Sequence, residues 1–267
     1  MNFTLTTMGT ASAMPISDRN PSAQMLNVHG RLFLIDCGEG TQQAVRRATL
    51  SFVKIDAIFI SHIHGDHVFG LFGLLSTISL YGRTQKLDIF GPAGLGTIIK
   101  FYQTHFGEET GFEIAFHGIR PSEPEVIYEC GVVSVSAFPL NHKIECYGFR
   151  FDEKVSRRRP GNPPFIPHSY AYCSDTAPFD RLPLWVRGVD VLYHEATYVE
   201  QFADKAALYH HSTAAQAARC ALEAGVGKLL IGHYSSRVRD ISRFEEEARK
   251  IFSNTVAASD GDVFDIC

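Results

Sequence analysis

The heptapeptide SHIHGDH, residues 61–67, constrains this chain more than any other feature of its sequence. It places three histidines and one aspartate within six positions, namely His62, His64, Asp66 and His67. Neutral imidazole and carboxylate are ligands that Zn²⁺ and similar ions prefer. Four ligands so close together cannot converge on one tetrahedral ion without strain. We therefore expect the first two to serve one ion and the last two another, with Gly65 allowing the loop to turn.

Three more candidate ligands stand where apolar strands are expected to end. His142 follows VSVSAFPLN, Asp175 follows YAYCS and His233 follows KLLIG. A rigid strand end is where a scaffold presents a functional side chain. A carboxylate can also bridge two metals, which a histidine does poorly. Taken singly, each residue would more often be structural, but as a set they complete the ligands of two ions.

The arrangement of expected elements is strands followed by helices in both halves of the chain. The expected strands cover residues 3–9, 23–28, 31–38, 56–61, 86–91, several up to 142, 169–175, 190–197 and 228–233. The expected helices cover residues 39–50, 68–82, 92–106, 213–225 and 241–252. His29-Gly30 suits a hairpin turn, and Thr213 with Gln216 resembles a capping box. This alternation predicts an α/β protein with two sheets face to face and helices on the outer faces.

Composition narrows the class of protein. The chain has 267 residues, of which 45% are apolar and 20% charged, which is ordinary for a globular protein. Its net charge of −4 gives no overall basic field, so nucleic-acid binding would depend on a local patch. The six cysteines are scattered without a C-x-x-C pair, and we interpret them as reduced thiols. No apolar run is long enough to span a membrane, and the first residues do not resemble a secretory signal. These features predict a soluble, cytoplasmic protein with no membrane partner.

Longer motifs identify a resemblance to a known family. The seven ligand candidates match the pattern of the metallo-β-lactamase superfamily in order and context. Within it, the chain resembles the ribonuclease Z family of tRNA 3′-processing endonucleases, from about residue 9 to residue 237. The segments that carry this resemblance are FLIDCGEGTQQAVRR, IFISHIHGDHVFGLFGLL, LYHEATY, HHSTAAQAA and IGHYSSR. The resemblance implies one αββα sandwich domain over residues 1–267, two divalent ions, Zn²⁺ or alternatively Mn²⁺, and a homodimer.

The resemblance also implies a role for each site residue. One metal would be held by His62, His64 and His142, the other by Asp66, His67 and His233, and Asp175 would bridge them. A hydroxide activated by the two ions would then attack a phosphodiester. Asp66 would orient this nucleophile, His211 would protonate the leaving 3′-oxygen, and Glu195 would orient His211. We assign His210 no role and interpret His194 as structural or supporting. Asp36 either hydrogen-bonds the metal loop or stabilises its own turn.

Two departures from the family concern the substrate. The family's long tRNA-binding arm lies between the ligands that correspond to His142 and Asp175, a span of 33 residues here. We expect only a short loop at residues 152–167, whose basic run is either a phosphate contact or an ordinary solvated loop: Arg157, Arg158 and Arg159. The family's P-x-K-x-R-N loop, which reads the tRNA 3′ end, corresponds to PISDRN, where Ser17 replaces the lysine. Arg19 and Asn20 match it and are expected to bind substrate.

Three functions remain open from the sequence. The first is a metal-dependent phosphodiesterase of the ribonuclease Z type, removing 3′ trailers from tRNA precursors. The second keeps the metal chemistry but acts on small or cyclic nucleotide diesters, which the short loop and the net charge favour. The third is a non-catalytic module that binds tRNA or a partner. A module without catalysis would be expected to have a degenerate ligand set, whereas all seven candidate ligands are present.

Overall fold

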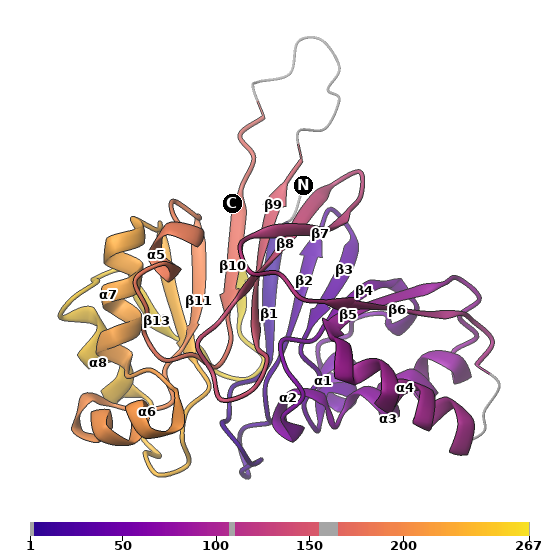
Figure 1. Ribbon diagram of the computed structural model, residues 1–267, viewed down its shortest axis with the longest axis horizontal. Helices are drawn as coiled ribbons and strands as arrows, with labels where there is room; N and C mark the ends of the chain where they lie inside the picture. The colour runs from indigo at the N-terminus through magenta and orange to yellow at the C-terminus, as the bar shows by residue number, and fades with distance from the viewer. Residues whose placement is uncertain (1–2, 107–109, 155–164, 267) are drawn as a thin grey trace.

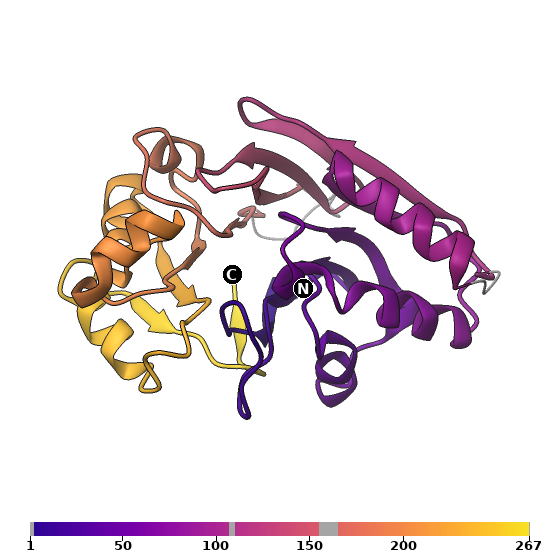
Figure 2. The same ribbon diagram turned by 60° about the horizontal axis from the view of Figure 1, so that its bottom comes forward.

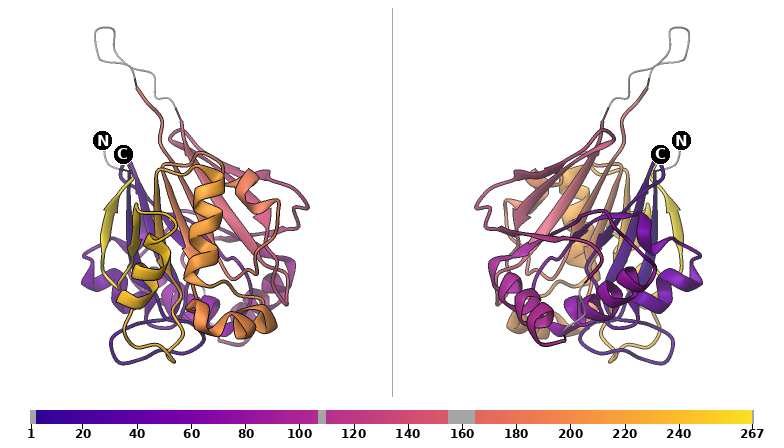
Figure 3. Two further views of the ribbon diagram at one scale, coloured as in Figure 1. Left: turned by 90° about the vertical axis from the view of Figure 1, so that its left-hand side faces the viewer. Right: turned by 90° about the vertical axis from the view of Figure 1, so that its right-hand side faces the viewer.

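The computed structural model describes residues 3–106, 110–154 and 165–266 and contains two seven-stranded sheets. The first sheet has the order β14(Val263–Asp265), β1(Phe3–Gly9), β2(Ala23–Val28), β3(Arg31–Ile35), β4(Ile55–Phe59), β5(Leu87–Pro92) and β6(Ile114–Ile119). The second has the order β13(Thr255–Ala257), β12(Lys228–Gly232), β11(Val191–Glu195), β10(Ser169–Cys173), β9(Tyr147–Glu153), β8(Val133–Pro139) and β7(Glu125–Glu129). The first and last strands pair, with Thr4 opposite Asp265, so both ends of the chain lie together (Figure 3).

Helices lie on both sides of the paired sheets (Figure 1). Those on the first sheet are α1(Thr41–Arg47), α2(Gly65–Val68), α3(Leu71–Leu80) and α4(Ala93–His105). Those on the second are α5(Leu182–Trp185), α6(Ala203–Tyr209), α7(Ala214–Ala224) and α8(Ser242–Arg249). The short 3₁₀ turns are η1(Phe52–Lys54) and η2(Glu200–Phe202). Turning the molecule shows the two helical layers on opposite sides (Figure 2), and the expected αββα sandwich is confirmed.

Strand periodicity explains the layers. In β3, Phe33 and Ile35 face a core shared by both sheets, whereas Leu32 and Leu34 pack beneath the helices of the first sheet. In β11, Tyr193 faces the shared core and Leu192 packs beneath the helices of the second sheet. Because successive side chains of a strand point to opposite faces, strands covered on both sides are apolar throughout.

Each sheet has an antiparallel part and a parallel part. In the first sheet β3, β4, β5 and β6 run parallel, and in the second β10, β11, β12 and β13 run parallel. Parallel strands end at one edge of their sheet, where open α/β sheets bind their ligands. The segments that follow β4, β10, β11 and β12 carry most of the residues singled out in the sequence.

Most expected elements are confirmed, including the hairpin at His29-Gly30 and the capping box of α7, but some boundaries differ. The segment expected as a loop begins later than residue 152, because Asp152 and Glu153 still pair within β9. Residues 155–164 lie outside the described part, and with them Arg157, Arg158 and Arg159. Short elements such as α6 and β14 were not expected. Among the described residues, no helix is long and apolar enough to cross a membrane.

Candidate metal centre

Four segments bring the seven candidate ligands together. His62 lies just beyond β4, and the next turn is α2, with His64 as its N-cap and Asp66 and His67 within it. His142 follows β8, Asp175 follows β10, and His233 follows β12 directly. His233 has a φ of 61°, which turns the chain sharply at the strand end. The first four ligands come from one sheet and the last three from the other, so the centre lies between the sheets.

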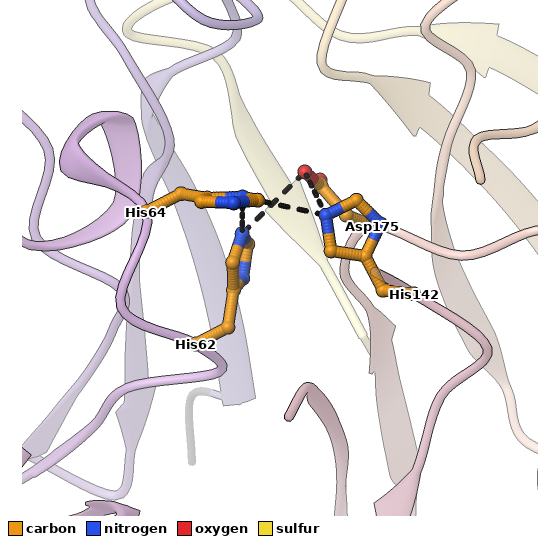
Figure 4. Close-up of side chains that lie close together, drawn as sticks. All are labelled: His62, His64, His142 and Asp175. Carbon is orange, nitrogen blue, oxygen red and sulfur yellow. Dashed lines mark hydrogen bonds and ion pairs between the residues drawn. The ribbon is translucent and has the colours of Figure 1, made fainter. Parts of the chain in front are cut away.

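Four ligand atoms form the first group (Figure 4). His64 Nδ1 lies 3.1 Å from His62 Nε2 and 3.3 Å from His142 Nε2. Asp175 Oδ2 lies 3.5 Å from His62 Nε2 and 3.8 Å from His142 Nε2. Zn–N bonds of about 2.0–2.1 Å give a tetrahedron with edges of roughly 3.3–3.4 Å. The four atoms are therefore spaced as ligands of one tetrahedral ion.

The second group has the same spacing. His233 Nε2 lies 3.3 Å from His67 Nε2 and 3.4 Å from Asp66 Oδ2. The other oxygen of Asp175, Oδ1, lies 3.5 Å from His67 Nε2 and 3.3 Å from His233 Nε2. Asp175 thus offers one oxygen to each group. The ligand atoms fall into the two groups expected from the sequence, with Asp175 between them, and the binding of an ion by each group stays a prediction.

Asp175 also shows that the centre suits a cation. The residue is only 2% exposed, and its Oδ1 accepts no hydrogen bond within the described part of the chain. A buried carboxylate oxygen without a partner is costly unless a cation compensates it. The chemistry of the donor set and the spacing of its atoms therefore both fit divalent metal ions.

Asp36 holds the metal loop, residues 61–67, in place through hydrogen bonds. Its Oδ2 accepts hydrogen bonds from His67 Nδ1 and from the Tyr172 hydroxyl, each at 2.7 Å, and from the Ser61 hydroxyl at 2.8 Å. Its Oδ1 accepts the Ser61 backbone N–H at 2.7 Å. The hydrogen bond to Nδ1 directs Nε2 of His67 toward the metal centre. Of the two roles open for Asp36 in the sequence, the structure selects the support of the metal loop.

Two other ligands are oriented in the same way. His142 Nδ1 donates to the backbone oxygen of His210 at 2.9 Å, and His233 Nδ1 donates to the Thr197 hydroxyl at 2.8 Å. His210, to which the sequence assigned nothing, thus contributes its carbonyl through a left-handed turn with a φ of 56°. Thr197 was also missed. Its position at the end of the H-E-A-T motif was the available signal.

His211, which is partly exposed, and the buried Glu195 form a pair beside the candidate metal ligands. His211 Nδ1 donates to Glu195 Oε1 at 3.1 Å, and it lies 3.9 Å from Asp175 Oδ2. Glu195 also accepts backbone N–H groups from Thr197 at 2.8 Å and from Ser212 at 2.8 Å. The carboxylate is therefore fixed by the backbone and fixes the imidazole in turn.

The pKa values of the pair follow from this environment. Burial alone would lower the pKa of His211, but the charges of Glu195 and Asp175 raise it to about 9. Burial opposes ionisation of Glu195, and the charge and hydrogen bond of His211 nevertheless lower its pKa. His211 therefore carries a proton at neutral pH, as a proton donor must.

The histidines of the first ligand group behave differently. Desolvation lowers the pKa of His62, His64 and His142 below the ordinary value, so these rings are neutral. Neutral imidazole is the form that binds a metal ion. In the second group, burial opposes protonation of His67, yet the carboxylates of Asp175, Asp66 and Asp36 raise its pKa. Metal binding there competes with a proton.

Two cavities flank the ligands. One, of about 520 Å³, is lined by Pro15, Pro21 and Phe69, and the other, of about 580 Å³, by Lys143, Tyr209 and Arg237. His64 and His211 line both. A substrate that extends to both sides of the metal centre therefore has room on each side.

Arg19 and Asn20 belong to the loop whose other residues line these cavities, but neither of the two lines a cavity itself. Arg19 is 6% exposed, its guanidinium carbon lies 5.7 Å from the centroid of the Tyr234 ring, and its Nε has no hydrogen-bond partner among the described residues. The Asn20 backbone N–H donates to Asp260 Oδ2 at 2.7 Å. Farther along the loop, the Ala13 backbone N–H donates to Asp66 Oδ2 at 2.7 Å. The loop is thereby tied to a metal ligand.

Comparisons with known proteins match this chain to two families. Residues 3–160 match the family model described as anti-Pycsar protein Apyc1. Ribonuclease Z of Bacteroides fragilis is 37% identical over 295 residues, covering 97% of each chain, and that of Cytophaga hutchinsonii is 38% identical over 301 residues, covering 99% of this chain and 96% of the relative. Human tRNase Z, short form, superposes with a TM-score of 0.84 at 30% identity over 99% of both chains.

Proposed function

Because the chain belongs to the ribonuclease Z family, and by residues 3–160 also to the family of anti-Pycsar protein Apyc1, we propose that it is a metal-dependent endoribonuclease that removes 3′ trailers from tRNA precursors. The observation that carries this proposal is the complete centre: two groups of ligand atoms share Asp175, and the His211–Glu195 pair lies beside them. A non-catalytic module would need neither feature. The names of the relatives supply the substrate class.

The ions proposed for the centre are two Zn²⁺, with Mn²⁺ as the alternative. His62, His64 and His142 would hold one, Asp66, His67 and His233 the other, with Asp175 shared. When bound, such ions lower the pKa of water and neutralise charge on the phosphate oxygens. The nitrogen-rich first group favours Zn²⁺ over harder cations. Elemental analysis of protein purified without added metal tests the identity and number of the ions.

The residues of the chain have separate tasks in the proposed reaction. Asp66, whose carboxylate is held by the Ala13 backbone N–H, orients the attacking water. Burial opposes ionisation of Asp66, but the charge of His67 and the contact with His233 depress its pKa, so that it remains a carboxylate. His211, held by Glu195, gives its proton to the leaving 3′-oxygen, because an alkoxide is a poor leaving group.

The loop of Arg19 and Asn20 is proposed to meet the substrate through its tip. Ser12, Ala13 and Pro15 of this loop line the cavities beside the ligands. Arg19 and Asn20 would act by holding the loop rather than by touching the nucleic acid. Replacing Asn20 by Ala should then raise KM for an RNA substrate and leave the number of bound metal ions unchanged.

A second candidate substrate is a small or cyclic nucleotide diester. The alignment with the Bacteroides fragilis relative runs over 295 residues although this chain has only 267, so the relative contains segments that this chain lacks. A chain with less surface for RNA and a net charge of −4 is expected to bind a large polyanion more weakly. The same centre would hydrolyse the smaller diester.

The test of function is cleavage of a tRNA precursor with a 3′ extension by the metal-loaded protein. A single cut near the discriminator base that disappears with a chelator is the expected result. A protein that holds two metals, leaves the precursor intact and hydrolyses a cyclic nucleotide would overturn tRNA processing in favour of the second candidate. A metal-loaded protein that cleaves neither substrate would refute both candidate functions.

We also propose that the protein is a homodimer of the cytoplasm, as the family resemblance implies. Among the described residues, α4 leaves Phe101 and the following Phe106 exposed, an apolar face suited to a second copy. Sedimentation equilibrium measures the mass directly. A monomer at micromolar concentration would contradict the dimer.

A further inference from the structure

A third cavity, of about 260 Å³, lies on the helical side of the second sheet, and none of the seven ligands lines it. One wall is a stripe of α7 formed by Gln216, Cys220 and Glu223, which are spaced three or four residues apart. The opposite wall is segment 178–183, which leads into α5. Figure 3 shows α5 beside α7 on this side of the molecule.

His194 lines the cavity because of strand alternation. Tyr193 faces the core between the sheets, and Glu195 ends the strand at the metal centre. His194 lies between them and therefore points to the opposite face, where the helices pack. The H-E-A-T motif thus serves two sites with adjacent residues. The structure gives His194 a place that the metal centre does not use.

The hydrogen bonds of His194 fix its tautomer. Nδ1 lies 2.7 Å from the backbone oxygen of Glu195, and a carbonyl oxygen can only accept, so Nδ1 carries the proton. Burial lowers the pKa of His194, so the ring is neutral. Nε2 is then an acceptor without a hydrogen-bond partner among the described residues, and the side chain, 1% exposed, lines the cavity. The cavity therefore offers a free acceptor to a ligand that carries a hydrogen-bond donor.

The remaining lining defines what kind of donor fits. Phe179 and Leu182 supply apolar surface, and burial raises the pKa of Cys220 to about 12, so its thiol is neutral. Asp180 and Glu223 place two carboxylates at the mouth. The cation there, Arg219, lies 4.0 Å from the carboxylate of Glu200. The two carboxylates disfavour phosphates and other anions, and the apolar side chains leave room for a ligand that combines a hydrogen-bond donor with apolar surface.

We propose that this cavity binds a small neutral heteroaromatic molecule whose ring N–H donates to His194 Nε2. The ring would lie against Phe179 and Leu182, between α7 and the segment before α5. The site is separate from the substrate-binding cavities and does not depend on the identity of the nucleic-acid substrate.

A ligand bound in this cavity would affect the metal centre. Ser212, which lines the cavity, donates its hydroxyl to the Thr176 backbone oxygen at 2.7 Å and its N–H to Glu195 Oε1 at 2.8 Å. Ser212 follows His211, and Thr176 follows Asp175, in the chain. A ligand that moves this wall therefore moves the proton donor and the shared ligand, and we infer that it changes the cleavage rate.

The test uses the metal-loaded full-length protein and two probes, indole and 1-methylindole. Indole donates an N–H and does not ligate metals, whereas 1-methylindole has nearly the same shape without the donor. Calorimetric titration should show saturable binding of indole and at least tenfold weaker binding of 1-methylindole. Equal affinity for the two probes, or binding of neither, would overturn the proposal without any variant.

A cavity-filling variant locates the bound probe. Cys220→Phe places a ring in the cavity and should abolish indole binding. Leu222→Phe, on the exposed side of α7, is the matched control and should bind as the unmodified protein does. Indole binding retained in a folded, metal-loaded Cys220→Phe protein would place the probe elsewhere and refute the site.

The cleavage assay tests the coupling separately. Saturating indole should change the rate of chelator-sensitive phosphodiester cleavage at least twofold in the unmodified protein and leave Cys220→Phe unaffected. An unchanged rate with indole bound would refute the coupling. Because binding is measured without turnover, failure of the tRNA assignment would leave the titration result intact.

Discussion

Asp175 is the residue on which the metal centre depends most at the scale of single side chains. Its two oxygens face different ligand groups, and Oδ1 has no hydrogen-bond partner among the described residues. Asn keeps the size of the side chain but replaces one oxygen by an amide that cannot bridge two cations. The carboxylate, and not the shape, is what the two groups share.

We expect Asp175→Asn to bind fewer than two metal ions and to lose at least a hundredfold in phosphodiester cleavage, in line with the typical effect of removing charge stabilisation at such a centre, about 10²–10³. Plasma emission spectroscopy gives the metal content and a cleavage assay the rate. Asp152→Asn, which changes a partly exposed carboxylate of β9 away from the ligands, is the control. Two tightly bound ions in the Asp175→Asn protein would contradict the shared-ligand assignment.

The His211–Glu195 pair predicts the pH profile. The pKa of His211 is raised to about 9, so the protonated donor is present at neutral pH and is lost as the pH rises through that value. Glu195→Gln removes the negative charge, lowers the pKa of His211 and should move the alkaline limb of kcat to lower pH. A variant limb that coincides with that of the unmodified protein would show that His211 is not the titrating donor.

At the scale of elements, a close backbone contact explains why residue 70 is glycine. The segment before α3 lies directly against the turn after β3. A Cβ at Gly70 would lie 2.0 Å from the backbone oxygen of Gly38, whereas a Cβ at Gly73 would lie 3.2 Å from the flexible side chain of Gln42. The metal loop precedes α3, and Cys37 donates its N–H to the His67 carbonyl oxygen at 2.8 Å. Close backbone contact thus positions the ligands.

We therefore expect Gly70→Ala to destabilise the fold by roughly 1–3 kcal/mol through steric crowding. Gly73→Ala, in the same helix, is the matched control and should be neutral or stabilising by up to about 1 kcal/mol, because Ala favours helix. Urea unfolding of both proteins provides the comparison. Equal urea midpoints for the two variants would show that the turn after β3 shifts at little cost, which would contradict the expected crowding.

At the scale of the whole molecule, the metal centre joins the two sheets. His62 follows a strand of the first sheet, and Asp175 and His233 follow strands of the second. Ions bound there stabilise only the folded chain, in which these ends meet. The stabilisation is about 4 kcal/mol for each site at a free metal concentration of a thousand times Kd.

Removing both ions with a chelator should accordingly lower Tm by roughly 16–32 °C, because about 8 kcal/mol is lost and about 1 kcal/mol corresponds to roughly 2–4 °C in a chain of this size. The single domain proposed for residues 1–267 predicts that both sheets unfold in one transition. Differential scanning calorimetry measures Tm and the number of unfolding transitions. A Tm that does not respond to the chelator in a protein shown to hold metal would refute the joining role.

The sequence by itself determined the layers and the candidate ligands, because both depend on local patterns. SHIHGDH is a contiguous motif, apolar runs in β4 and β12 are readable as buried strands, and Thr213 with Gln216 specifies the start of α7. Only the tertiary structure decided which oxygen of Asp175 faces which group, that Asp36 supports His67, and that Arg19 is buried beneath its loop. These depend on contacts between segments far apart in the chain, such as Asp36 and His67, which are 31 positions apart, and no local pattern encodes them. The cavity beside His194 depends in the same way on how α7 packs against segment 178–183.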